Sequence, residues 1–157
     1  LLLKGPFIYE SLLRVGCIMK GPSIPKNLVI DDPVSTLDIP ATLYDYANIT
    51  NPMELNSKSL LGLMHNKENR DFAYSEWDLR SSRTGLELDL RVARTKGAKL
   101  IYEEISQTGE MYILSEDPGE MNNVFNDTAY SKIQKELIDM IKSRPNDAIP
   151  KLDQVGM

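Results

Sequence analysis

This sequence has a single cysteine and a single histidine among its 157 residues, so it lacks most of the side chains that build disulfides and soft-metal sites. With Cys17 alone, no internal disulfide can form, and its apolar neighbours Val15-Gly16 and Ile18-Met19 predict a small buried side chain rather than a reactive thiol. His65 has no second ligand at metal-binding spacing and is expected at the surface. Apolar runs stay far below the ~20 residues of a membrane-spanning helix, which excludes a span of the bilayer as a function.

Blocks of like charge are also missing. Acidic and basic residues are interspersed and the formal net charge is -5, so no basic face is offered to a phosphate backbone and nucleic acid is excluded as a partner. Nothing indicates an oxidising compartment; a cytoplasmic location is expected, with a periplasmic or secreted parent protein as the alternative. Leu1 to Pro6 carry neither an initiator Met nor a basic segment, and we expect a fragment that begins within a fold.

Turn signals divide the chain near residue 66. In the front half, the apolar run Arg14 to Met19 predicts a buried strand, and Ser35 or Thr36 predicts the start of a helix that contains Pro40 in its first turn. A polar loop over 48–58 and a short helix over 59–64 follow. Glu10 and Arg14 have the spacing of an i to i+4 ion pair.

The back half has a period of two. Leu88, Leu90 and Val92 alternate with charged residues and predict a half-buried antiparallel strand, with further strands over 72–77, 99–105 and 110–114. A helix over 128–142 is expected to pack on the apolar face of this sheet, and Pro145 ends it. Asp117 and Glu120 are expected to shape a turn. Adjacent carboxylates, as in Glu103-Glu104 and Asp31-Asp32, point to opposite faces of an extended chain and cannot share one substrate.

Three separated segments carry a resemblance to a known family. They are Lys4-Gly5-Pro6-Phe7-Ile8-Tyr9-Glu10 with Arg14-Val15, then Val34 to Thr42, and then Gly109 to Leu114 with Asp117-Pro118-Gly119-Glu120-Met121-Asn122-Asn123. In order and spacing they resemble the sulfatase family of the alkaline-phosphatase-like superfamily. Arg14-Val15-Gly16, Phe72 to Arg80 and Gln154 to Met157 are similar to its bacterial branch of phosphonate monoester hydrolases and arylsulfatases. Gly16 and Ile113 depart from the common pattern, at positions that look structural.

This resemblance implies an α/β fold of the alkaline-phosphatase-like type. Residues 1–66 are expected to form the C-terminal end of the catalytic α/β domain. Residues 67–157 are expected to form a C-terminal α+β subdomain, an antiparallel sheet with a helix and a proline-rich tail, within a homo-oligomer. The alternative, from another class of function, is a non-catalytic oligomerisation module that uses an exposed sheet and the tail over 145–157.

The resemblance also implies the chemistry: hydrolysis of small sulfate, phosphonate or phosphate esters by a formylglycine, made from Cys or Ser in C/S-x-P-x-R, beside a divalent metal, Ca, Mg or Mn. Cys17 is followed by Ile18-Met19-Lys20 and does not fit that motif. The metal ligands are expected upstream, so the fragment by itself is expected to be inactive. Lys4 is the one catalytic residue that the resemblance assigns, as a cation on the sulfuryl or phosphoryl oxygens.

Overall fold

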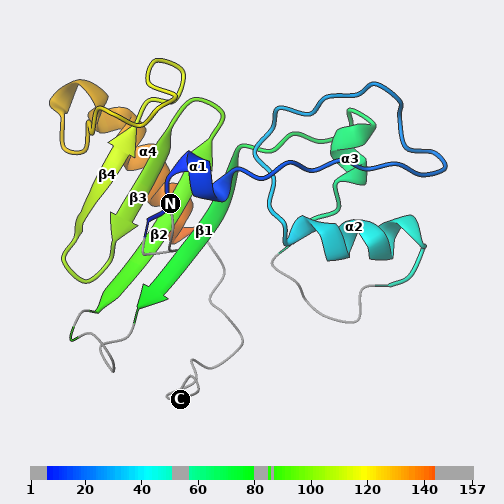
Figure 1. The fold of residues 1–157 in the computed structure, drawn as a ribbon, viewed down its shortest axis with the longest axis horizontal. Coiled ribbons are helices and arrows are strands. Elements are labelled where there is room, and N and C mark those ends of the chain that lie inside the picture. Colours follow the sequence, from blue (N-terminus) through cyan, green and yellow to red (C-terminus); the bar gives the residue numbers. More distant parts are fainter. Residues whose placement is uncertain (1–6, 51–56, 80–84, 86, 144–157) are drawn as a thin grey trace.

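A four-stranded antiparallel sheet forms the back half of the chain (Figure 1). The computed structural model describes residues 7–50, 57–79, 85 and 87–143. In sequence order and in spatial order the strands are β1 (Phe72–Leu79), β2 (Leu88–Thr95), β3 (Lys99–Glu103) and β4 (Thr108–Tyr112). The alternating pattern and the turn signals therefore predicted the meander correctly, because both are local properties of the sequence.

One face of the sheet is covered by the C-terminal helix α4 (Ser131–Lys142), which follows the short helix η1 (Thr128–Tyr130). Leu137 and Ile141 of α4 pack with residues of three consecutive elements of the sheet region, namely Ala93, Leu100, Met111 and Ile113. The Asp127 carboxylate accepts a hydrogen bond from the amide of Ala129 and caps η1.

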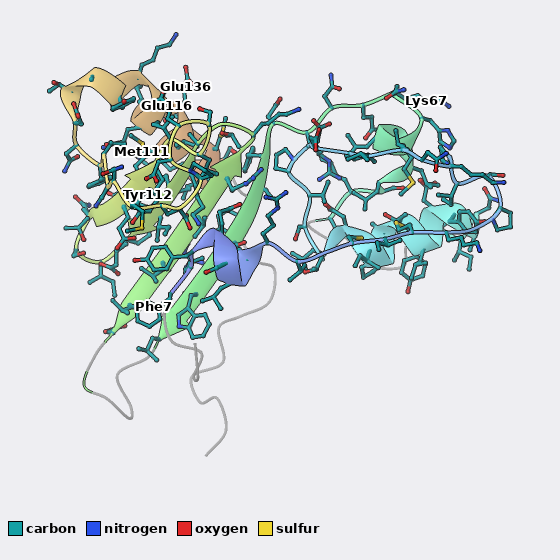
Figure 2. The ribbon with its side chains drawn as sticks, turned by 45° about the horizontal axis from the view of Figure 1, so that its top comes forward. Phe7, Lys67, Met111, Tyr112, Glu116 and Glu136 are labelled. Carbon is teal, nitrogen blue, oxygen red and sulfur yellow. The ribbon has the colours of Figure 1, made fainter. Side chains whose placement is uncertain are left out.

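The opposite face is covered by the first described segment, which includes α1 (Glu10–Leu13). Ile8 packs there against Leu90, Val92, Ile101 and Tyr112. Met111 and Tyr112, labelled in Figure 2, are consecutive residues of β4 and belong to the two different clusters. The expectation that α4 covers the Leu88-Leu90-Val92 face was wrong. Amphipathicity shows that a face is buried, but it does not show which segment buries it.

The front lobe, which we define as residues 14–50 and 57–71, contains two helices, α2 (Asp38–Tyr46) and α3 (Leu61–Met64), and a long irregular segment leads from α1 to α2 (Figure 1). The buried strand predicted over 14–19 is absent, and Cys17 is exposed rather than buried. Among the described residues nothing pairs with this run: Ile18 is 97% exposed and Val15 61%. An apolar run predicts that its side chains are buried, but burial requires another segment that packs over them.

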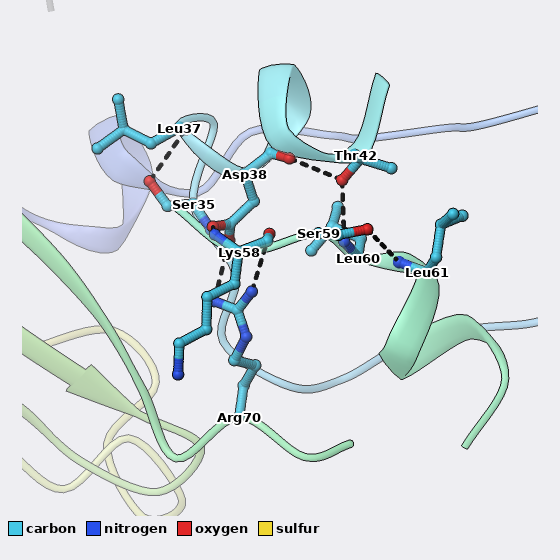
Figure 3. Close-up of polar contacts among 9 residues, drawn as sticks. All are labelled: Ser35, Leu37, Asp38, Thr42, Lys58, Ser59, Leu60, Leu61 and Arg70. Atoms are coloured by element: carbon cyan, nitrogen blue, oxygen red, sulfur yellow. Dashed lines mark hydrogen bonds and ion pairs between the residues drawn. The ribbon is translucent and has the colours of Figure 1, made fainter. Parts of the chain in front are cut away.

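The start of α2 is held by one buried carboxylate (Figure 3). Asp38 is 2% exposed and accepts hydrogen bonds from the backbone amides of Ser35, at 2.9 Å, and of Lys58, at 3.0 Å. Arg70 Nη1 lies 3.2 Å from the same carboxylate. Ser35 Oγ accepts from the amide of Leu37, but α2 has Leu37 at its N-cap and no side-chain cap, so Ser35 closes the turn before the helix and the predicted capping by Ser35 or Thr36 was wrong.

Thr42 joins α2 to the segment that leads into α3. Its hydroxyl donates to the carbonyl oxygen of Asp38 at 2.6 Å and accepts from the amide of Leu60 at 2.9 Å (Figure 3). The side chain is completely buried. Asp38 and Thr42 belong to the second of the three resembling segments, and both have structural contacts here. That segment therefore builds the front lobe.

None of the helices in the described part of the chain is long and apolar enough to cross a membrane. The fold is mixed α/β, with an antiparallel sheet and a C-terminal helix, as expected. Segment 7–13 lies on the sheet of the back half. The division near residue 66 and the domain roles on either side of it stay a prediction, and the predicted tail over 145–157 lies outside the described residues.

Gly109 offers a test of the sheet. A Cβ at this position would collide with the carbonyl oxygen of Ile101 on β3 and would press on the ring of Phe125. We expect Gly109→Ala to lower the free energy of unfolding by about 1–3 kcal/mol, as overpacking does. Gly97→Ala is the matched control, because a Cβ there meets nothing within 4 Å, and it should leave stability unchanged or raise it by up to about 1 kcal/mol. Equal urea midpoints for the two variants would contradict this packing.

Candidate functional site

Lys4, the residue predicted to be catalytic, lies outside the described residues. The description starts at Phe7, three residues later, and shows how the chain that follows Lys4 is held. Ile8 is 4% exposed, and its carbonyl oxygen accepts a hydrogen bond of 2.8 Å from Lys99 Nζ. A lysine on the central strand β3 thus holds the backbone of the first resembling segment.

Lys99 is the centre of a group that we call the buried charge cluster: Lys99, Glu10, Glu120 and Arg94. The ammonium group of Lys99 is completely buried and is paired with the carboxylates of Glu120 and, at 3.6 Å, Glu10. Arg94 Nη2 lies 3.2 Å from Glu10 Oε2. Two cations and two anions meet in one place, so the charge buried beneath α1 is balanced.

The register of the sheet explains why these residues meet. Arg94 is the cross-strand partner of Lys99, and Lys99 is the partner of Tyr112, so the three side chains form one row on the α1 face. Glu10 opens α1 and points toward this row. The predicted i to i+4 pair of Glu10 with Arg14 was therefore wrong. The sheet beneath this four-residue helix offers Glu10 the buried Lys99 and the half-buried Arg94, and Arg14 stays exposed.

Glu120 brings the third resembling segment into the same cluster. Its Oε2 accepts a hydrogen bond of 2.6 Å from the amide of Glu10. The Asp117 carboxylate accepts from the amides of Met121 and Asn122, both at 2.8 Å, and closes the turn around it. The predicted turn role of Asp117 is confirmed, whereas Glu120 also reaches across to the first segment. The first and third segments are thus joined through Glu10, Glu120 and Lys99.

A cavity of about 320 Å³ lies beside this cluster. It is lined by residues of segment 7–13 and of the strands β2, β3 and β4: Phe7, Ile8, Tyr9, Leu88, Leu90, Ile101, Glu103, Thr108, Gly109 and Glu110. The rings of Phe7 and Tyr9 are stacked, with centroids 6.4 Å apart. The wall is mostly apolar, and its two carboxylates come from β3 and β4.

The pKa values of Tyr9, in this wall, and of Tyr112, whose ring contacts that of Tyr9, are both raised. Burial, together with the hydrogen bond of 2.7 Å from its hydroxyl to Glu110, raises the pKa of Tyr112. Burial and the negative charge of Glu110 raise the pKa of Tyr9 in the same way. At neutral pH both groups can donate hydrogen bonds, but neither can serve as a phenolate nucleophile.

Glu103 is ionised at the end of β3. Burial opposes its charge, but hydrogen bonds from the Ser106 hydroxyl and from the amides of Asp89, Ser106 and Ile105 outweigh that effect and lower its pKa to about 2. Glu103 is buried and its neighbour Glu104 is exposed, as expected of adjacent residues on a strand. The Glu103 carboxylate therefore organises the turn that follows β3.

A second, larger groove of about 760 Å³ lies between the sheet and the front lobe. Arg14, Ser35, Tyr74 and Arg94 are among the residues that line it. Within residues 7–50, 57–79, 85 and 87–143, no group of three or more His, Cys, Asp or Glu side chains could hold a metal ion. Cys17 is free and His65 is exposed.

Sequence reasoning missed Lys99. A weak signal was available, because this lysine stands within the run Ala98-Lys99-Leu100-Ile101 and shares the strand face of Ile101. A cation on the apolar face of a strand is rare unless it is paired. Its partners lie 89 positions before it, at Glu10, and 21 after it, at Glu120. No local pattern could have identified them.

Comparisons with known proteins identify a matching family and several relatives. The family model described as "N-sulphoglucosamine sulphohydrolase, C-terminal" matches residues 3–147. The chain is 29% identical over 144 residues to an N-acetylglucosamine-6-O-sulfatase of Bacteroides thetaiotaomicron, and this match covers 87% of the chain and 25% of the relative. It is 31% identical over 138 residues to arylsulfatase K of Mus musculus, covering 82% of the chain and 25% of the relative.

A solved structure gives the same result for the fold. The crystal structure of a putative sulfatase from Bacteroides thetaiotaomicron superimposes with a TM-score of 0.76 at 28% sequence identity, over 88% of this chain and 31% of that one. The chain thus spans about a quarter of the length of these curated relatives and about a third of the solved structure.

The low pKa of Glu103 makes stability depend on pH. Because its folded-state pKa lies near 2, below the usual 4.5, its stabilising effect is complete above pH 4.5 and is lost as the pH falls toward 2. We expect Glu103→Gln to lower the free energy of unfolding at pH 7, and the deficit should shrink between pH 4.5 and 2. The exposed Glu104→Gln serves as control in urea titrations at each pH. A deficit that stays constant over this range would contradict the assignment.

Proposed function

The chain belongs to the sulfatase family and is similar to the C-terminal part of its members. On this basis we propose that it forms the C-terminal part of an enzyme that hydrolyses sulfate esters. The observation that carries the proposal is the match over residues 3–147, which includes all three resembling segments. The first and third of those segments meet in the buried charge cluster, and the second, Val34 to Thr42, builds the front lobe. The family resemblance is therefore supported by contacts as well as by sequence.

An exposed apolar surface supports the view that more protein packs on the front lobe. Val15, Ile18, Val29, Leu43 and Ile49 are each more than half exposed, and Ile18 and Val29 reach 97% and 79%. Soluble monomers seldom leave so many apolar side chains of one region in water. The relatives are about four times as long as the match, so they have the additional chain that could cover this region.

The described residues do not fit the nucleophile or the metal of the family. Cys17 is exposed but is followed by Ile18-Met19-Lys20, so it cannot become the formylglycine. No candidate metal ligand set exists in the described part of the chain. In the proposed enzyme the remaining part of the protein supplies the formylglycine and the ligands of a divalent metal such as Ca, Mg or Mn.

Within this scheme Lys4 supplies a compact positive charge to the oxygens of the transferring group. The relatives named here are sulfatases, and the name of one specifies the 6-O-sulfate of N-acetylglucosamine. They favour a sulfate ester of a sugar as the substrate. A phosphonate ester, suggested by the bacterial-branch segments, stays a prediction, as does the homo-oligomer.

The non-catalytic alternative relied on an exposed sheet and on the tail over 145–157, and the tail lies outside the described residues. In the described part of the chain, α1 packs on one face of the sheet and α4 on the other, which weakens the first support. The front lobe also has an apolar surface that could serve assembly. We assign that surface to the rest of the same enzyme, because the family match extends through it.

Turnover measurements test the proposal directly. The purified chain alone should not hydrolyse an aryl sulfate or a sulfated glucosamine at any concentration of divalent metal, because it has no candidate for the formylglycine. A longer polypeptide that joins this chain to a sulfatase N-terminal part with a C/S-x-P-x-R motif should hydrolyse at least one of them. Turnover by the chain alone, or none by the longer polypeptide on any sulfate ester, would contradict the proposal.

Lys4 is tested in the longer polypeptide. We expect Lys4→Ala to lower kcat by a factor of order 10²–10³, the usual effect of losing a preorganised charge. Lys4→Arg should also be impaired, since a planar fork does not replace an ammonium group at a tight tetrahedral anion. The exposed Lys132→Ala is the control. Steady-state kinetics measure the effect, and melting curves exclude misfolding of the variants. A kcat that is unchanged in Lys4→Ala would contradict the catalytic role of Lys4.

A further inference from the structure

We infer that Lys99 and Glu120 are positioning residues, which fix the backbone at Ile8 and Glu10 and thereby support catalysis by the first resembling segment. The inference deepens the proposed function and rests on it for the role of Lys4. Lys99 and Glu120 act through the main chain of the first resembling segment and do not contact substrate themselves.

The contacts that carry the inference are made with backbone atoms. Lys99 Nζ donates to the carbonyl oxygen of Ile8 at 2.8 Å, and Glu120 Oε2 accepts from the amide of Glu10 at 2.6 Å. The two contacts lie two residues apart on the segment. One binds a main-chain acceptor, the Ile8 carbonyl, and the other a main-chain donor, the Glu10 amide. Ile8 follows Lys4 by four residues in the sequence.

A contribution to stability does not by itself explain why the charged Lys99 stands at this buried position of β3. Lys99 is completely buried, and taking an ammonium group out of water costs several kcal/mol before its partners compensate. Its strand neighbours Ala98, Leu100 and Ile101 are apolar and buried, and a methionine of similar length would fill the same space. Replacing a buried ion pair by well-packed apolar residues is often neutral or stabilising, so net stability is a weak reason for this pair.

The two side chains are themselves held by rigid parts of the structure. Lys99 begins β3, a central strand that is paired on both sides, and it lies in register with Arg94 and Tyr112. Glu120 has a positive φ of 55°, a conformation that a residue other than glycine keeps only where its surroundings require it. The turn closed by Asp117 provides that requirement. The holding groups are therefore in place before substrate binds.

The decisive experiment separates charge balance from positioning. In the longer polypeptide, Lys99→Met leaves Glu120 buried without its main cation and should lower the melting temperature. The double variant Lys99→Met/Glu120→Gln removes both charges and keeps an acceptor for the Glu10 amide, so the melting temperature should recover toward wild type. Its kcat should nevertheless stay about 10- to 100-fold low, because a displacement near 1 Å has effects of that size. KM should change less than about threefold.

Arg70→Met is the matched control, since it breaks another buried ion pair, with Asp38, in the front lobe. It should lower the melting temperature but leave kcat within about twofold of wild type. If the double variant regains both melting temperature and kcat, the cluster serves stability only and the inference is overturned.

Hydrogen–deuterium exchange gives a readout that does not need activity. Amides over residues 5–13 should exchange faster in the double variant than in wild type, while α4 should be unaffected. If the wild-type polypeptide hydrolyses no sulfate ester, the proposed function fails, and this exchange measurement still decides whether Lys99 and Glu120 position the segment. Unchanged exchange over 5–13 in the double variant overturns the inference in either case.

Discussion

The completely buried ammonium group of Lys99 is the constraint on which the back half of the structure depends. A charge in that position requires anions, and the chain supplies them from two distant places, Glu10 and Glu120. Meeting that requirement brings α1 onto the sheet and the loop after β4 onto α1. The hydrophobic contacts of Ile8 with Val92 and Ile101 bury apolar surface, and the ion pairs fix which residues lie against each other.

The front lobe is organised by a comparable principle on a smaller scale. Asp38 and Thr42 satisfy backbone groups of segments that would otherwise be loops, and Arg70 balances the carboxylate. Each of the three resembling segments thus contributes a buried or half-buried polar side chain that holds the chain: Glu10, Asp38 and Glu120. A residue can be characteristic of an enzyme family because it places the chain, without touching the substrate.

Local sequence patterns predicted structure correctly where the segment that a residue packs against is close in sequence. The strands over 72–112 and the helix after Asp127 were predicted because alternation, turn residues and capping are all local. The strand over 14–19 was predicted wrongly for the opposite reason. Its apolar residues require a covering partner, and no described segment covers Ile18. The pairing of Glu10 with Arg14 failed likewise, since a nearer partner in sequence was not the nearer one in space.

By itself the sequence determined the family, the period of each main element and the lack of a nucleophile, because motif order, alternation and the residues after Cys17 can be read along the chain. Only the tertiary structure decided which faces are covered, that Lys99 holds Ile8 and that Glu120 reaches Glu10. Those contacts join residues 91 and 110 positions apart. Their energies arise from burial and from charges brought together by the whole fold, and no short segment contains that information.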